Sequence, residues 1–211
     1  TFAMAAAAME LKRLGLARKP MFVVPNHMLG QFSSELLLLY PGANVLAAGK
    51  DDFASAGRRE LMSRIATNNW DAVIVTHSGF ERLPISTAAQ KQFFQTQLEE
   101  LEACIREVKD GRGSRIVKEI ERAKKRLEFK LESLAAEHRK DNTLTFEELG
   151  VDRLFVDEAQ AFKNLFYTTK MTRVAGLPQS ASERAFDMLL KVQHVQRING
   201  GGGVVFATGT P

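Results

Sequence analysis

The sequence predicts an α/β fold built on a parallel sheet, and two observations carry that prediction. Five short apolar runs, rich in β-branched residues, are bounded by turn-forming residues, and helical patterns lie between most of them. The runs are almost continuously apolar, which is typical of strands that are buried on both faces. Helices that alternate with such strands return the chain to the same end of the sheet, so the strands run parallel.

The predicted elements follow one another in a regular order. The strands are "MFVVP" (21–25), "NVLAA" (44–48), "DAVIVT" (71–76), "RLFVDEA" (153–159) and "VVFATG" (204–209). Helical patterns cover residues 2–14, 27–39, 56–67 and 181–198. The run "NGGGG" (199–203) lacks the Lys-Ser/Thr that completes a phosphate loop, and it predicts a flexible connection into the last strand.

Residues 88–141 interrupt this order and predict an inserted antiparallel helical hairpin. Apolar residues recur there at spacings of four and three on both sides of "KDGRGS", whose glycines can reverse the chain. The segment holds 13 Lys or Arg and 11 Asp or Glu, a net charge of +2. This near balance favours a solvated, ion-paired surface over a basic nucleic-acid arm. The sheet domain then consists of residues 1–87 and 142–211.

The composition narrows the class of protein. The 211 residues are 45% hydrophobic and 26% charged, as in a soluble globular domain, and no apolar run is long enough to cross a membrane. A single cysteine, Cys104, excludes an internal disulfide and fits a reducing compartment such as the cytoplasm. One Cys and four scattered His give no zinc-binding spacing. The net charge of +4 permits a nucleic-acid partner without requiring one.

Polar residues follow four of the predicted strands. They are "PNH" after Val24, "THS" after Val75, "DEAQ" after Val156 and "TGTP" after Ala207. In open parallel sheets, ligands bind beyond the carboxyl ends of the strands. The four clusters therefore predict one active face.

Asp157 and Glu158 are the candidate catalytic pair on that face. Burying two adjacent acids is costly unless a cation, a proton or a ligand compensates them. An acid at this place can hold Mg²⁺, usually through water, while its neighbour orients and deprotonates an attacking water. The alternative is that both acids cap the helix that follows, where negative charge is favoured.

These clusters resemble the motifs of one family. "VDEAQAFKN" resembles motif II of the DEAD/DEAH-box group in helicase superfamily 2, with Gln160 where His is commoner, and Lys163-Asn164 resembles its Snf-type branch. "VVFATGTP" resembles motif III. "FVVPNHMLGQFSSE", with Gln31 and Glu35, resembles motif Ia, and "DAVIVTHSGFE" resembles motif Ib. The resemblance covers the chain outside 88–141 and is closest to helicase-like proteins of bacterial plasmids and phages, some fused to DNA methylases.

The resemblance implies the first of two RecA-like (P-loop NTPase) lobes, binding ATP and Mg²⁺. Thr1, followed by an Ala-rich helix, resembles the last residue of the family's Gly-Lys-Thr phosphate loop and would be a ligand of Mg²⁺ beside Asp157. The chain would then be a fragment that begins just after the lysine and hydrolyses ATP negligibly by itself. The local alternative is that Thr1 caps a helix.

Further roles follow from the resemblance position by position. Gln160 would lie beside the γ-phosphate and contact the second lobe, and Thr208 and Thr210 would couple the nucleotide state to movement of that lobe. A nucleic-acid backbone would be contacted by polar residues of motifs Ia and Ib, namely Asn26, His27, Gln31, Thr76, His77 and Ser78. The local alternative is that Asn26 caps the helix after Pro25 and Ser78 ends a strand.

The sequence therefore predicts the ATP-binding lobe of a DNA helicase or translocase, with double-stranded DNA favoured as the partner. Three alternatives stay open. The chain could be a non-catalytic nucleic-acid-binding or scaffold module with the same fold, or a nucleotide hydrolase or kinase outside the helicases. In the third alternative, the 88–141 hairpin is the working surface for a protein partner.

Overall fold

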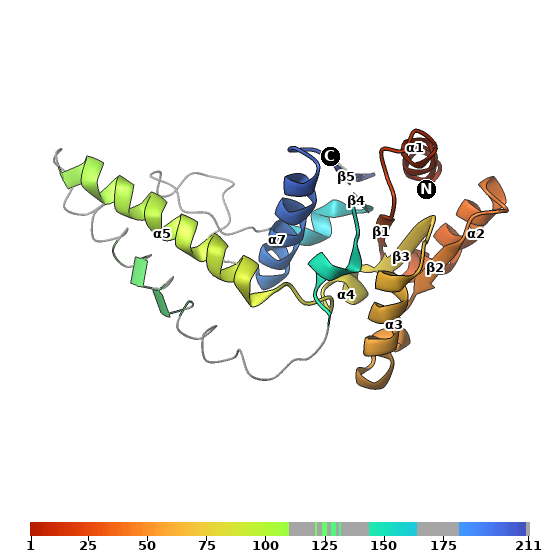
Figure 1. Ribbon diagram of the computed structural model, residues 1–211, viewed down its shortest axis with the longest axis horizontal. Coiled ribbons are helices and arrows are strands. Elements are labelled where there is room, and N and C mark those ends of the chain that lie inside the picture. Colours follow the sequence, from red (N-terminus) through yellow and green to blue (C-terminus); the bar gives the residue numbers. More distant parts are fainter. Residues whose placement is uncertain are drawn as a thin grey trace.

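The computed structural model describes residues 1–109, 144–163 and 182–209, together with several helical residues between 121 and 131. Figure 1 shows a sheet domain from which one long helix projects. Part of the predicted hairpin, Asn164 and Thr210 lie outside the described residues.

Five parallel strands form one sheet, which confirms the predicted α/β class. The strand order is β2-β3-β1-β4-β5. The strands are β1 (Pro20–Val24), β2 (Val45–Ala48), β3 (Ala72–Thr76), β4 (Arg153–Val156) and β5 (Val204–Phe206). Every residue of β1 and β3 is buried, as the continuous apolar runs predict for central strands.

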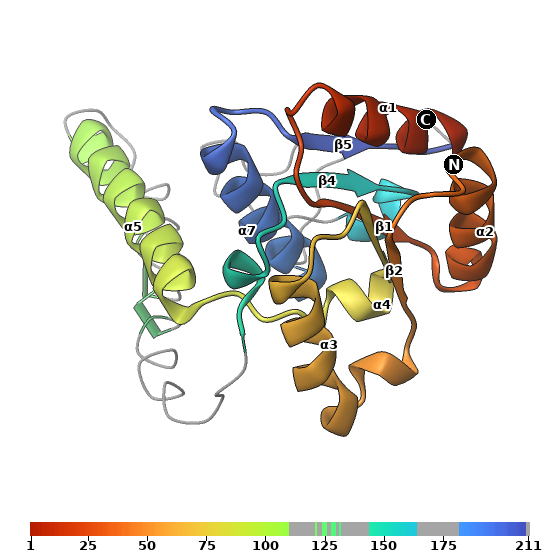
Figure 2. The ribbon, with the colours of Figure 1, turned by 45° about the vertical axis from the view of Figure 1, so that its right-hand side comes forward.

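Helices cover both faces of this sheet, as Figure 2 shows. The α-helices are α1 (Phe2–Arg13), α2 (Leu29–Leu39), α3 (Ser55–Thr67), α4 (His77–Phe80), α5 (Thr87–Lys109) and α7 (Glu183–Ile198). Short 3₁₀ turns are η1 (Asn26–Met28), η2 (Asp51–Phe53), η3 (Phe146–Leu149) and η4 (Ala159–Phe162). The predicted helix at 27–39 is thus divided, because its first residues form the separate turn η1.

The alternation of side chains along the strands divides the core into two layers. Phe22 and Phe155 point to the face covered by α1 and α2, where the Phe22 ring lies 5.1 Å from that of Phe32. Met21 and Leu154 point to the opposite face, which α3, α4, η3 and α7 cover. The helix α1 faces the sheet with small side chains, which explains its Ala-rich sequence.

The projecting helix α5 is anchored to the sheet domain at its first half. The ring of Phe94 stacks on that of Phe186 in α7 at 5.2 Å, and Phe93 contacts the same ring edge-on. Beyond this anchor, Lys124 Nζ lies 2.7 Å from Glu102 Oε1 and Leu131 packs against the Phe94 cluster. In these contacts, a later residue of α5 pairs with an earlier residue of the returning segment, as in an antiparallel hairpin. The boundaries of the inserted hairpin stay a prediction.

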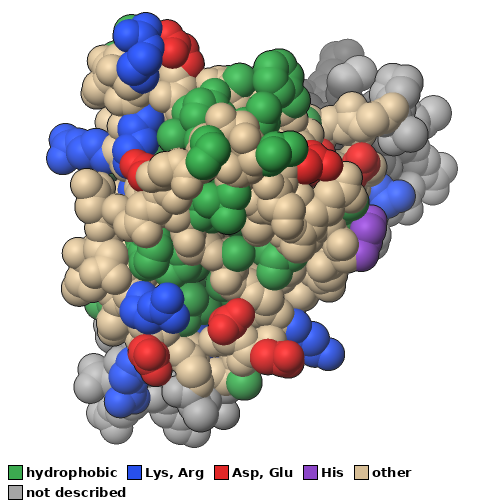
Figure 3. All heavy atoms as spheres, turned by 90° about the vertical axis from the view of Figure 1, so that its right-hand side faces the viewer, with side chains coloured by type: hydrophobic (Ala, Val, Ile, Leu, Met, Phe, Trp, Pro, Cys, Tyr) green, Lys and Arg blue, Asp and Glu red, His purple; other side chains and the backbone are tan. Residues whose placement is uncertain are grey.

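The face formed by α1 and α2 carries exposed apolar side chains. Leu38 in α2 is 80% exposed and Phe2 in α1 is 68% exposed. Figure 3 looks onto this side of the molecule and shows hydrophobic side chains gathered there between scattered charges. Among the described residues, no helix is both long and apolar enough to cross a membrane.

Gly79 tests how tightly α4 packs on the sheet domain. A Cβ at Gly79 would lie 2.5 Å from Cε2 of the buried Phe53 ring, so a methyl group cannot fit without moving that ring. We expect Gly79→Ala to lower the free energy of unfolding by about 1–3 kcal/mol. Gly30→Ala is the matched control, because Gly30 lies in α2 with no heavy atom near the added methyl.

Urea denaturation followed by circular dichroism measures both variants. The control should be unchanged or up to about 1 kcal/mol more stable, since alanine is the better helix former. Equal unfolding midpoints for the two variants would contradict the close packing of Gly79 on the Phe53 ring.

Candidate functional site

The polar clusters predicted from the sequence meet at one edge of the sheet. β3, β1, β4 and β5 are neighbours, and their parallel register pairs Val24 with Thr76, Val23 with Val156 and Val156 with Phe206. The strands therefore end side by side. Asp157 directly follows β4, and Asn26, Ser78 and Thr208 lie two residues beyond the ends of β1, β3 and β5. Figure 2 shows the amino end of α1 beside the tips of β4 and β5.

Backbone hydrogen bonds hold the turn after β4 from two sides. The Asp157 N–H donates to the carbonyl of Val23 at 2.8 Å, and the Ala159 N–H donates to the carbonyl of Ala207 at 3.0 Å. One bond joins the turn to β1 and the other to the segment after β5. The position of the two carboxylates is thus set by the strands on either side.

Glu158 has an unusual backbone conformation. Its φ of 51° and ψ of 50° are left-handed, and it alone among the described non-glycine residues has a positive φ. Such a conformation costs about 1–2 kcal/mol for a residue with a Cβ and is found where the surroundings impose it. The Glu158 side chain accepts a hydrogen bond from the amide of Gln160.

The cap alternative for the acidic pair is right about the position of Glu158 and wrong about its hydrogen bond. Glu158 occupies the N-cap position of η4, but no side-chain hydrogen bond caps that turn. Its carboxylate instead lies near the turn after β5, since a Cβ built at Gly209 would be 3.6 Å from Glu158 Oε1. Glu158, Gln160 and Gly209 therefore lie close together.

His77 lies inside the protein behind this turn. It is 7% exposed, and its Nε2 lies 2.8 Å from the carbonyl oxygen of Asp157. Its ring meets that of Phe162 edge-on at 5.1 Å. Burial lowers the pKa of His77, outweighing the carbonyl that favours the charged ring, so the neutral form is stabilised. Thr76 is also buried, and its hydroxyl accepts from the Gly79 N–H and caps α4.

Asn26 and Ser78 form a polar bridge between the ends of β1 and β3. Asn26 Oδ1 accepts from the Ser78 hydroxyl at 3.1 Å and from its N–H at 3.4 Å. Asn26 therefore does not cap a helix, and neither η1 nor α2 has a side-chain cap. Ser78 lies in the first turn of α4 and not at the end of the strand. His27 is exposed beside this bridge.

Thr1 and Gln31 both contact Glu35 in α2. The amide of Gln31 donates to Glu35 Oε1 at 2.7 Å. Hydrogen bonds from Gln31 and then Thr1 lower the pKa of Glu35, with a smaller effect from the amino terminus. Thr1 takes the N-cap position of α1 through its carbonyl, which accepts from the Ala5 N–H, while its side chain makes no cap hydrogen bond.

The other predicted positions are placed as follows. Thr208 is exposed in the turn after β5, next to Gly209, and Lys163 is exposed after η4. Phe162 and Arg184 were not singled out from the sequence, although they contact the site. The Arg184 guanidinium lies 4.7 Å from the Phe162 ring centre and pairs with Glu81 at the end of α4. No local motif marks such a contact between distant segments.

The chemistry of the turn fits a magnesium nucleotide in part. Carboxylate oxygens are the ligands that Mg²⁺ prefers, and it commonly takes one or two of them plus phosphate oxygens and water. Asp157 and Glu158 supply such oxygens. The part of the chain that the structure describes holds no group of three or more His, Cys, Asp or Glu suited to a metal ion. A ligand would therefore have to complete the coordination.

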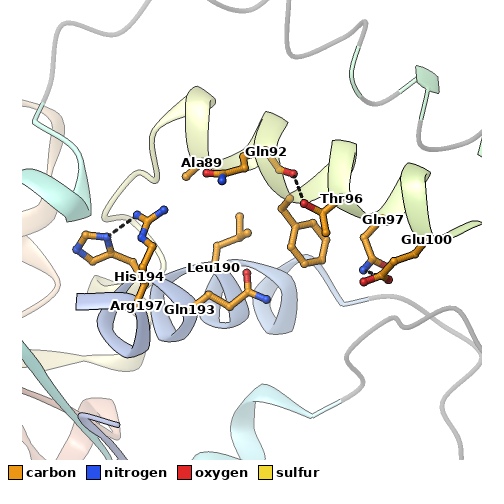
Figure 4. A pocket seen from close by; sticks show the side chains of 10 residues that line it. Ala89, Gln92, Thr96, Gln97, Glu100, Leu190, Gln193, His194 and Arg197 are labelled. Carbon is orange, nitrogen blue, oxygen red and sulfur yellow. Dashed lines mark hydrogen bonds between the residues drawn. The ribbon is translucent and has the colours of Figure 1, made fainter. Parts of the chain in front are cut away.

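One hollow lies apart from these residues. Its volume is about 280 Å³, and it separates α5 from α7 (Figure 4). Polar side chains of both helices point into it, among them Gln92, Gln193 and Arg197, whose guanidinium is bonded to His194. None of the predicted site residues lines this hollow.

Comparison with known proteins identifies the family to which the chain belongs. A family model described as "Probable helicase domain" matches residues 1–211. The chain is also similar to the "Defense against restriction protein B" of Escherichia phage P1, with 27% identity over 152 residues, or 71% of this chain. The matched part is 7% of the length of that relative. No solved structure matches the chain significantly.

The left-handed backbone of Glu158 leads to a stability prediction. Asparagine tolerates this conformation and β-branched residues do not. We expect Glu158→Asn to unfold at or slightly above the wild-type denaturant concentration. Glu158→Val should be less stable than Glu158→Asn by about 1–2 kcal/mol. Chemical denaturation measures both, and equal stability of the two variants would show that the turn does not impose the conformation.

Proposed function

Because the chain belongs to the family described as "Probable helicase domain", we propose that it forms the ATP-binding lobe of a nucleic-acid motor. One observation carries the proposal. Asp157 and Glu158 follow a buried central strand, in a turn held between the carbonyls of Val23 and Ala207. Acids fixed at the carboxyl end of a parallel strand, beside a Thr-Gly turn, suit the hydrolysis of a nucleoside triphosphate.

Each residue of the turn has a role in this proposal. Asp157 would hold Mg²⁺, partly through water, and Mg²⁺ when bound would neutralise the phosphate oxygens. Glu158 would orient the attacking water and accept its proton. Gln160, bonded to Glu158, would fix the direction of that carboxylate. Thr1 would join the metal site through its hydroxyl.

The nucleic-acid surface proposed for this lobe is the bridge between β1 and β3. Asn26, His27 and Gln31 are exposed, and Ser78 is half-buried beside Asn26. Amide and hydroxyl groups of this kind contact phosphates without reading sequence. Thr76 and His77 are buried, so they would support this surface from beneath.

The partner proposed for this surface is duplex DNA. The Lys163-Asn164 pair and the Snf-type resemblance favour duplex translocation over strand separation. The name of the phage relative, which concerns defence against restriction, fits DNA better than RNA. A second RecA-like lobe, contacted through Thr208 and Thr210, and a cytoplasmic setting complete the proposal.

The test is ATP hydrolysis by the full-length polypeptide in which these residues occur, with and without duplex DNA. We expect DNA to stimulate hydrolysis and Glu158→Gln to reduce kcat by a factor of about 10² or more, as for loss of a general base. Glu60→Gln, which changes an exposed acid of α3, is the control and should leave the rate unchanged.

Two results would reject the motor. Hydrolysis that is absent, or that is indifferent to both DNA and Glu158, would favour a non-catalytic nucleic-acid-binding or scaffold module. A gel-shift measurement with duplex DNA would then separate binding from no interaction.

A further inference from the structure

His77 contacts both ends of the turn that carries the acidic pair. Its Nε2 meets the carbonyl of Asp157, where the turn starts, and its ring meets the edge of Phe162, where η4 ends. A carbonyl oxygen can only accept a hydrogen bond, so Nε2 carries the proton. Glu158 lies between these two contact points in its left-handed conformation.

The histidine is itself held firmly. It is the first residue of α4, whose start is capped by the buried Thr76 hydroxyl. The far end of α4 is held by Lys191 of α7, which is fully buried and donates to the Phe80 carbonyl at 2.6 Å and to Asp187 at 2.5 Å. A ring fixed in this way can transmit a constraint to the backbone of the turn.

Two charged residues near His77, Arg184 and Glu81, pair with each other. Arg184 of α7 lies over the Phe162 ring and pairs with Glu81 of α4. His77, Phe162 and Arg184 thus come from three segments that are far apart in the sequence. Their packing joins α4 and α7 to the turn after β4.

We infer that His77 is a positioning residue, whose Nε2–H bond to the Asp157 carbonyl and edge contact with Phe162 hold the Asp157–Glu158 turn in its hydrolytic geometry. His77 follows Thr76 and precedes Ser78, which bridges to Asn26. A phosphate bound at Asn26 and Ser78 would contact the residue next to His77, so nucleic acid would reach Glu158 through His77 and the Asp157 carbonyl. The catalytic part of the inference rests on the proposed function, and the geometric part does not.

Three substitutions distinguish the effect of the His77–Asp157 hydrogen bond from the effect of the volume that the His77 ring fills. The side-chain nitrogen of Gln reaches the position of Nε2, so His77→Gln keeps the donor. The shorter Asn carries its nitrogen at the position of Nδ1, so His77→Asn loses the bond to Asp157. Phe162→Leu keeps His77 and removes the ring edge.

The geometric part is tested by hydrogen exchange of the backbone amides in the full-length polypeptide. We expect His77→Asn to speed exchange at Ala159 and Ala161, whose N–H groups are bonded to Ala207 and Glu158, by about tenfold. His77→Gln should stay within about threefold of the wild type. The exchange rates of the β1 amides should be unchanged in both His77 variants.

The catalytic part is tested by steady-state kinetics with and without duplex DNA. His77→Asn should lower kcat about tenfold or more, leave the KM for ATP within about twofold and reduce the stimulation by DNA. His77→Gln should retain most of the activity. A purely structural role would reduce the active fraction without this rescue by the donor-bearing variant.

The outcomes distinguish the two proposals. Unchanged exchange at Ala159 and Ala161 in His77→Asn, or equal losses in the Gln and Asn variants, would overturn the positioning role whatever the ATPase result. If the wild type does not hydrolyse ATP but the exchange pattern is as expected, the proposed motor function is rejected. The positioning of the turn by His77 then still stands. If His77→Asn does not fold, Phe162→Leu decides, since unchanged exchange at these two amides would overturn the role.

Discussion

The parallel pairing of β1 with β4 is the constraint on which the candidate site depends. Its register brings Val23 level with Val156, so that the next residue, Asp157, can donate to the Val23 carbonyl. A shift of the register by one residue would turn the side chains of β4 to the other face of the sheet. The apolar residues that fill the two core layers therefore also fix where the acids lie.

The same pairing explains why the turn after β4 can keep a costly backbone conformation. Hydrogen bonds of its two neighbours hold the left-handed Glu158 in place. The Asp157 N–H donates to Val23 of β1, the Ala159 N–H donates to Ala207 after β5, and the Asp157 carbonyl accepts from His77 of α4. Each bond contributes on the order of 1 kcal/mol, which together exceeds the cost of the conformation. The strain is held by the scaffold and directs the carboxylate toward Gly209.

The sequence predicted the sheet and the edge where the clusters meet, because apolar runs and turn-forming residues are local signals. It did not predict how the members of each cluster are bonded. Asn26 and Ser78 are 52 residues apart, and His77 and Asp157 are 80 apart, so only the folded chain shows that these pairs touch. The same limit applies to Glu158, whose conformation is imposed by neighbouring strands and has no signature in "VDEAQ".

β5 has a consequence for the behaviour of the chain in solution. Within the described residues it is an outer strand of the sheet, and Val205 and Phe206 are 44% and 55% exposed. An outer strand offers N–H and C=O groups to any extended segment that approaches, including one from another copy. The strand is only three residues long and follows a run of glycines, which weakens such pairing. Self-association through the free edge of β5 would therefore occur only at high protein concentration. It would extend the sheet without disturbing the acidic turn.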